Sequence, residues 1–142
     1  MAKPSLTINR RFKAPPEKVF AAWTRAENLM QWFGPASAEM KNAQADARVG
    51  GRFSAGFTTP DGERHDVSGV YREVVPNRKL VFTWAWRTTP ERESLVTLTF
   101  KPDGDGTLFT LLHEQFFDQA ARDGHERGWT GTMDKLGQFV EA

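Results

Sequence analysis

Residues 128–140 read GWTGTMDKLGQFV, and their apolar positions follow a helical spacing. Positions i, i+4, i+7 and i+11 are all apolar: Trp129, Met133, Leu136 and Val140. This periodicity predicts a long C-terminal helix with one apolar face, and Asp118 is a suitable N-cap. Four glycines each lower the helix's intrinsic stability by roughly 1 kcal/mol relative to alanine. We therefore expect the helix to depend on tertiary packing, or to use its glycines for close approach to a sheet.

Between residues 36 and 116 the periodicity changes. Apolar and polar residues alternate in short runs, as they do in antiparallel strands with one buried face. Turn sequences such as Pro60-Asp61-Gly62 and Pro102-Asp103-Gly104 separate the runs. This hairpin spacing predicts a meander of about six strands.

The segment before the meander predicts one strand and two short helices. Residues 6–13 alternate in polarity, and Pro16 suits the first turn of a helix over residues 16–25. A second helix is predicted over residues 26–32. One long helix can cover only one face of such a sheet, so we expect an α+β fold. Its antiparallel sheet, of about six to seven strands, would curve around the C-terminal helix. No linker or repeat interrupts the chain, so residues 1–142 predict a single domain.

Composition argues against several classes of function. The 19 basic and 18 acidic residues are spread along the chain without a basic run, which disfavours nucleic-acid binding. There is no cysteine, and His65, His113 and His125 show no metal-ligand spacing, so we expect no metal and no cofactor. No serine lies in a G-x-S-x-G context, which disfavours a serine hydrolase.

The N-terminal sequence gives the expected location. It contains no apolar h-region, so no signal peptide is predicted. No stretch of the chain approaches about 18 consecutive apolar residues, so no membrane-spanning helix is predicted. We therefore expect a cytoplasmic protein.

Several short motifs follow one another along nearly the whole chain. They are Ala14-Pro15-Pro16-Glu17-Lys18-Val19-Phe20, Trp32-Phe33-Gly34-Pro35, Asp46-Ala47-Arg48-Val49-Gly50-Gly51, Leu80-Val81-Phe82-Thr83-Trp84, Val96-Thr97-Leu98-Thr99-Phe100, His113 and Gly128-Trp129. Together they resemble the START-like (SRPBCC, or birch-pollen-allergen-like) superfamily. Within it, they are most similar to the bacterial AHSA-like branch, which resembles the C-terminal domain of the activator of the 90 kDa heat shock protein ATPase. The resemblance implies a helix-grip fold whose cavity, between sheet and C-terminal helix, often takes lipids or other apolar ligands.

The inward faces of the predicted sheet and helix supply the candidate pocket wall. Its residues are mostly apolar, as in most ligand pockets: Phe53, Phe57, Tyr71, Phe82, Trp84, Trp86, Phe100, Leu111, His113, Trp129 and Met133. The alternative is that these residues pack against one another as core. The pair Trp32-Phe33 is either a lid at the cavity mouth or a helix end anchored in the core.

Three functions remain open. The leading hypothesis is non-catalytic binding or carriage of a small apolar or aromatic molecule, because the inward faces carry many rings and few titratable groups. The second is an enzyme of the dehydratase or cyclase type in which His113 and Tyr71 transfer protons. The alternative role for His113 is that of a core residue whose hydrogen bonds are satisfied within the protein.

The third function is that of a stress-response protein that interacts with a chaperone or regulator. The resemblance covers only one part of the two-domain eukaryotic activator, and this disfavours a chaperone-interacting function. Leu108 and Leu112 are candidates for a homodimer contact.

Overall fold

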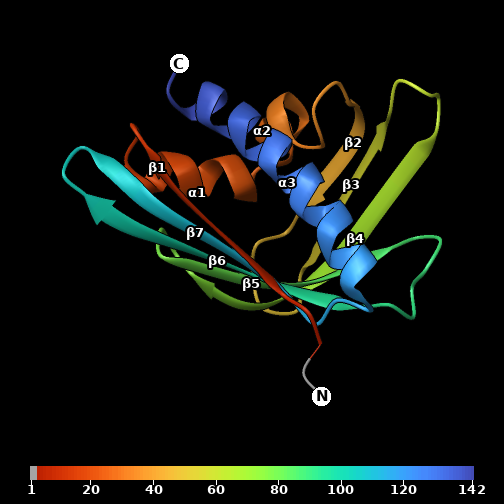
Figure 1. The fold of residues 1–142 in the computed structure, drawn as a ribbon. Coiled ribbons are helices and arrows are strands. Elements are labelled where there is room, and N and C mark those ends of the chain that lie inside the picture. Colours follow the sequence, from red (N-terminus) through yellow and green to blue (C-terminus); the bar gives the residue numbers. More distant parts are fainter. Residues whose placement is uncertain (1–2) are drawn as a thin grey trace.

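The computed structural model describes residues 3–142 and places three helices against one seven-stranded antiparallel sheet (Figure 1). The strands are β1 (Leu6–Phe12), β2 (Glu39–Ala45), β3 (Arg52–Thr58), β4 (Arg64–Val75), β5 (Lys79–Trp86), β6 (Ser94–Asp103) and β7 (Gly106–Glu114). The helices are α1 (Pro16–Thr24), α2 (Ala26–Trp32) and α3 (Gln119–Val140). The element order and the helix-grip fold predicted from the sequence are confirmed.

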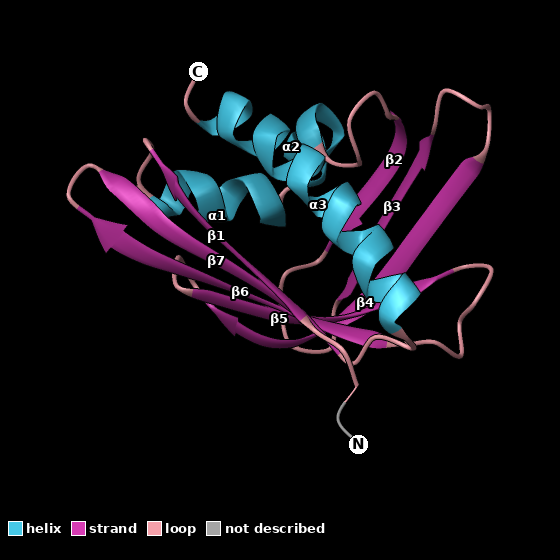
Figure 2. Ribbon diagram, in the orientation of Figure 1, coloured by secondary structure: helices cyan, strands magenta, loops and turns pink. Residues whose placement is uncertain are grey.

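The sheet order is β1-β7-β6-β5-β4-β3-β2, so the first strand pairs with the last. Leu6 lies opposite His113 in this antiparallel pair, and Phe12 lies opposite Thr107. The sheet curves around α3, and α1 and α2 lie on the same concave side toward one end of the molecule (Figure 2). There α1 contacts β6 and β7, whereas α2 contacts β2. The two short helices therefore fill one end of the concave face and leave the other end to α3 alone.

The core at the filled end is built around the indole of Trp23. This side chain is 1% exposed, and its ring centroid lies 4.8–6.4 Å from five other aromatic rings: Trp32, Phe33, Phe82, Phe109 and Trp129. Such ring pairs add to the apolar area that they bury. The helix α1 thus places a large ring where a wider cavity would otherwise lie between sheet and α3.

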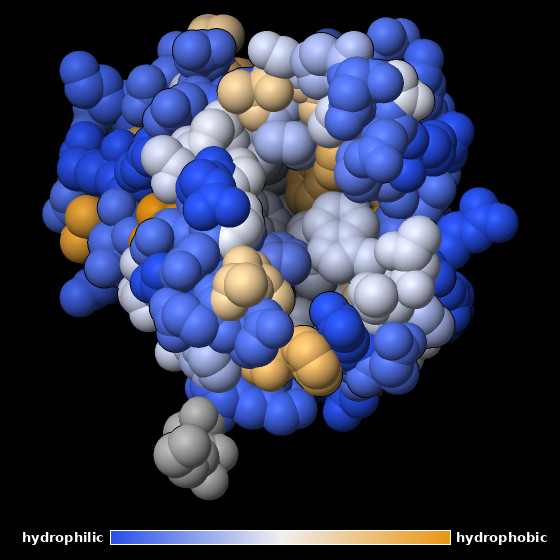
Figure 3. Space-filling view, turned by 45° about the vertical axis from the view of Figure 1, so that its right-hand side comes forward, coloured by the Kyte–Doolittle hydropathy of each residue, from blue (hydrophilic) through white to orange (hydrophobic). Residues whose placement is uncertain are grey.

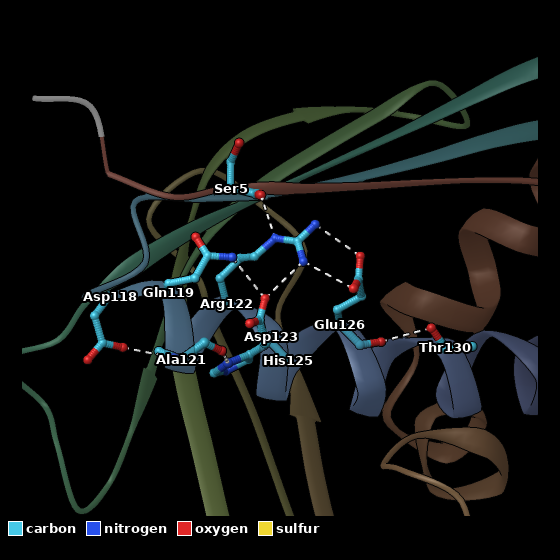
Figure 4. Close-up of polar contacts among 9 residues, drawn as sticks. All are labelled: Ser5, Asp118, Gln119, Ala121, Arg122, Asp123, His125, Glu126 and Thr130. Atoms are coloured by element: carbon cyan, nitrogen blue, oxygen red, sulfur yellow. Dashed lines mark hydrogen bonds and ion pairs between the residues drawn. The ribbon is translucent and has the colours of Figure 1, made fainter.

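The start of α3 is fixed by several polar contacts (Figure 4). Asp118 accepts a hydrogen bond from the backbone N–H of Ala121 at 2.8 Å, which confirms it as the N-cap. Arg122 donates through Nε to the carbonyl oxygen of Ser5 at 3.0 Å, and its two terminal nitrogens pair with the carboxylate of Glu126. The first turns of α3 are therefore tied to the segment that leads into β1. Among residues 3–142, no helix has the length and apolar character required to cross a bilayer.

Candidate functional site

A pocket of about 220 Å³ lies between the N-terminal half of α3 and strands β3–β5. It is lined by Phe33, Gly34, Pro35, Phe57, Thr59, His65, Trp84, Trp86, Gly124, His125, Gly128, Trp129 and Thr132. Five of these are Phe or Trp rings, and the exposed wall is almost wholly apolar. The space-filling view shows a hollow on this face with hydrophobic residues at its depth and hydrophilic residues around it (Figure 3). The wall has the character of a site for a small apolar molecule.

Two glycines of α3 leave this pocket open. Gly124 and Gly128 lie one helical turn apart, and both face the pocket. A Cβ atom built on Gly128 would meet no heavy atom within 4 Å, and one built on Gly124 would meet only a terminal nitrogen of Arg127, at 3.8 Å. By contrast, a Cβ on Gly131 would lie 3.2 Å from the backbone nitrogen of Ala36. Close packing therefore accounts for Gly131, whereas the first two glycines border empty space.

His125 joins α3 to β5 at the wall of the pocket. An indole N–H can only donate, so Nε2 of His125 must accept the hydrogen bonds from Trp86 at 2.9 Å and Trp84 at 3.3 Å. The proton then lies on Nδ1, which donates to the carbonyl oxygen of Ala121 at 2.7 Å. Burial lowers the pKa of His125, which agrees with this neutral form. The imidazole thus holds both indoles in place and has no hydrogen-bonding atom left over.

His113 is held in the same way, behind the pocket wall. Trp129 donates its indole N–H to Nδ1 of His113 at 3.0 Å, so the proton of the ring lies on Nε2. Nε2 is 2.7 Å from Oγ of Ser94, and that hydroxyl is 3.2 Å from the carbonyl oxygen of Trp84. Burial, with a smaller contribution from His125, brings the pKa of His113 well below its ordinary value. In this tautomer His113 donates to Ser94, so it is not poised to remove a proton from that hydroxyl.

The predicted pocket residues fall into two groups. Those on the wall of the pocket are Phe57, Trp84, Trp86 and Trp129, together with the predicted lid residue Phe33. Those buried in the core away from the lining are Phe53, Tyr71, Phe82, Phe100, Leu111, His113 and Met133. Trp32, the other predicted lid residue, donates its indole N–H to the carbonyl oxygen of Ala22 at 3.1 Å and is buried. Trp32 therefore anchors α2, while Phe33 faces the pocket.

The structure does not bring Tyr71 and His113 together on the pocket wall, since neither belongs to the lining. Tyr71 is buried against Phe82, and burial raises the pKa of its hydroxyl. Both ring nitrogens of His113 already have partners within the protein. Polar residues other than Tyr71 and His113 line the pocket. Among residues 3–142, no cluster of three or more His, Asp or Glu side chains is suited to a metal ion.

Sequence reasoning missed His125 and the glycine pair. His125 precedes Trp129 by four residues, so the stripe that begins at Trp129 extends back to it on the same helical face. Gly124 and Gly128 share that spacing, a signal of a face of α3 without side chains. The contribution of His65, at the start of β4, had no comparable signal, because it depends on how the sheet curves.

The two buried histidines predict a stability that decreases on acidification. Burial lowers the pKa values of both in the folded protein, while the unfolded chain binds protons below about pH 6.5. The stabilisation is therefore fully present above about pH 7. Below pH 6.5 the free energy of unfolding is expected to fall by up to about 1.4 kcal/mol per pH unit for each histidine. Urea denaturation at about pH 7, 6 and 5 measures this slope.

The variant His113→Asn supplies the comparison. Its carbonyl oxygen can still accept from the indole of Trp129, but the side chain does not titrate. The difference between the two slopes isolates His113, because all carboxylates are common to both proteins. We expect the variant's slope to be smaller by up to about 1.4 kcal/mol per pH unit. Equal slopes in the two proteins would contradict a neutral, buried His113.

Comparison with known proteins identifies relatives over nearly the whole chain. The family model described as "Activator of Hsp90 ATPase homolog 1-like protein" matches residues 13–141. The human protein named activator of 90 kDa heat shock protein ATPase homolog 1 is 27% identical over 125 residues. That match covers 87% of this chain but only 33% of the human protein, so the chain spans about a third of its relative's length.

Solved structures give the same picture. A crystal structure of a protein from Chromobacterium violaceum has a TM-score of 0.88 and 26% identity, with 97% of each chain covered. The crystal structure of the AHSA1 protein from Silicibacter pomeroyi has a TM-score of 0.84 and 30% identity, covering 95% of this chain and 96% of that one. These likenesses extend over the sheet and all three helices.

Proposed function

We propose that this chain, which belongs to the Activator of Hsp90 ATPase homolog 1-like family, binds and carries a small apolar or aromatic molecule without catalysis. The proposed site is the pocket between α3 and strands β3–β5. The observation that carries the proposal is the pair Gly124 and Gly128, which weakens α3 and leaves space rather than close packing. An apolar cavity of about 150 Å³ is enough for benzene. The 220 Å³ of this pocket therefore suits a molecule of one or two aromatic rings.

Binding is favoured over catalysis because two polar residues of the wall, His125 and Thr132, are already engaged in hydrogen bonds within the protein. Both nitrogens of His125 have protein partners. The hydroxyl of Thr132 lies 2.9 Å from the carbonyl oxygen of Gly34 and 2.8 Å from that of Gly128. A proton-transfer enzyme needs a group within reach of the substrate that is free to exchange its proton. These contacts instead support a rigid wall that excludes water from an apolar ligand.

Titration of ¹⁵N-labelled protein with 2-naphthol tests the proposal. The indole N–H signals of Trp84, Trp86 and Trp129 are expected to shift saturably, because all three rings line the pocket. The indole of Trp32 lies outside the lining, so the chemical shift of its N–H is expected to stay unchanged. This signal serves as a control in the same spectrum. Native mass spectrometry of the purified protein, with analysis of its organic extract, searches for the physiological ligand. If 2-naphthol and a panel of small apolar metabolites leave all indole signals unchanged, the carrier proposal fails.

Sequence identity to the human activator favours a second candidate, interaction with a 90 kDa heat shock protein chaperone. This chain corresponds to about a third of that protein, so the relative's whole activity does not transfer directly. Stimulation of the chaperone's ATPase by the purified chain would support this candidate. Stimulation without any ligand binding would favour it over the carrier function.

A further inference from the structure

We propose that the ligand is an amphipathic acid whose apolar body occupies the pocket and whose anionic group lies beside Arg87. This inference rests on the proposed carrier function and adds the chemical class of the ligand. A polar groove adjoins the pocket and is lined by Arg64, His65, Asp66, Trp86, Arg87 and Thr88. Two of these residues, His65 and Trp86, also line the apolar pocket. The groove lies where β4 begins and β5 ends, so a molecule seated in the pocket can extend past this end of the two strands into the groove.

The charges in the groove do not cancel. Arg64 donates two hydrogen bonds to Oδ1 of Asp66, from Nε at 3.3 Å and from a terminal nitrogen at 3.1 Å. The same terminal nitrogen also donates to the side-chain oxygen of Asn42 at 2.7 Å. This pair neutralises the single carboxylate in the groove lining. Arg87 makes no side-chain hydrogen bond or ion pair with residues 3–142, although its backbone N–H is fixed by the carbonyl oxygen of Asp66 at 2.9 Å. One positive charge is thus left over at the edge of the pocket.

Two neighbouring features bear on this charge. Across the pocket mouth, a terminal nitrogen of Arg127 lies 3.8 Å from the point that a Cβ of Gly124 would occupy, so a second guanidinium lies along the opposite rim. Two exposed acids lie nearby: Asp61, which accepts a hydrogen bond from Thr59 of the pocket lining, and Glu63, whose Oε2 is 3.8 Å from Nε2 of His65 and whose side chain is 72% exposed. Both carboxylates are exposed to solvent, where their repulsion of a ligand anion is screened. The rim therefore favours an anion at the end of an apolar ligand.

This proposal differs from simple apolar binding in whether the pocket binds an anion or the corresponding neutral molecule more tightly. A purely apolar pocket binds a neutral molecule better than the corresponding anion, because the anion must lose hydration. A preference for the anion requires a cation placed to receive it. Arginine suits this role because its planar guanidinium can pair with a carboxylate through two hydrogen bonds.

Binding of 2-naphthoic acid and of methyl 2-naphthoate, which share one ring system, tests the proposal at neutral pH by calorimetry. We expect the ionised acid to bind about five-fold tighter than the ester, as for a partly exposed ion pair. Arg87→Gln is expected to remove or reverse this preference without weakening the ester. Arg78→Gln, at the β4–β5 turn at the other end of β5, is the matched control and is expected to leave both affinities unchanged. Raising the salt concentration is expected to reduce the preference for the acid.

The outcomes also separate the two proposals. Tighter binding of the ester, or an acid preference that persists in Arg87→Gln, overturns the anion site but leaves the apolar pocket standing. Failure of both compounds to bind overturns the carrier function itself. An acid preference lost equally in Arg78→Gln and Arg87→Gln indicates attraction by overall charge, and this too overturns the assignment to Arg87.

Discussion

Gly128→Leu is expected to lower the affinity for 2-naphthol at least about 100-fold, which corresponds to about 2.7 kcal/mol of binding free energy. No heavy atom lies within 4 Å of a Cβ at this position, so the leucine side chain can enter the pocket without displacing the backbone. Gly128→Ala is expected to act in the opposite direction on stability. A single methyl group fits the same space and raises the free energy of unfolding by about 1 kcal/mol through helix propensity. Calorimetric titration and urea denaturation measure the two effects.

Thr130→Leu is the matched control for this substitution. Thr130 is exposed on the same helix, and it is absent from the pocket lining. Adding a leucine there is expected to leave the affinity for 2-naphthol within about two-fold of the wild-type value. Unaltered affinity in Gly128→Leu would show that the compound binds elsewhere and would remove the main support for the pocket as the functional site.

Trp23→Ala is expected to lower the free energy of unfolding by about 3–5 kcal/mol. The indole is buried among five aromatic rings from the end of α2, the sheet and α3, so its removal leaves a cavity that the core cannot readily close. A typical domain is stable by only about 5–15 kcal/mol in total. The variant is therefore expected to unfold at a much lower urea concentration than the wild type. Urea denaturation monitored by circular dichroism measures this difference.

Trp23→Phe separates the contribution of the ring contacts to stability from that of the indole N–H. Nε1 of Trp23 is the one fully buried side-chain nitrogen or oxygen without a hydrogen-bond partner among the described residues. Phenylalanine keeps most of the ring contacts and removes this unsatisfied donor, whose burial is unfavourable. We expect a loss of less than about 1.5 kcal/mol. Equal losses for Trp23→Phe and Trp23→Ala would mean that the indole N–H has a partner and contributes to stability.

Most of the fold could be predicted because its signals are local. The second helix was expected over residues 26–32 and occupies Ala26–Trp32, since Gly34-Pro35 cannot continue it. The strands follow from alternation between turn sequences, and the curvature follows from the need to cover one sheet with one long helix. Pairing of β1 with β7 is not local, and no periodicity in the sequence predicts it.

The site was harder to predict because all inward-facing residues look alike in sequence. Alternation placed Phe82 and Trp84 on one face, and both are indeed buried. Whether such a residue lies in a filled core or on a pocket wall depends on α1, which places Trp23 against Phe82. This contact joins segments far apart in the chain, and no periodicity reports it. The open space of the pocket borders α3 where the helix carries Gly124 and Gly128 instead of larger side chains.

The pairing of β1 with β7 has a consequence for synthesis on the ribosome. Leu6 pairs opposite His113, and Arg122 holds the carbonyl of Ser5 across 117 residues. During translation at about 5–20 residues per second, β1 must therefore wait roughly 5–20 s before its partner strand has been made. Throughout this interval it is an unpaired strand whose backbone can bond to another nascent chain. The sheet is therefore complete only after β7, the last of its strands in chain order, has been made.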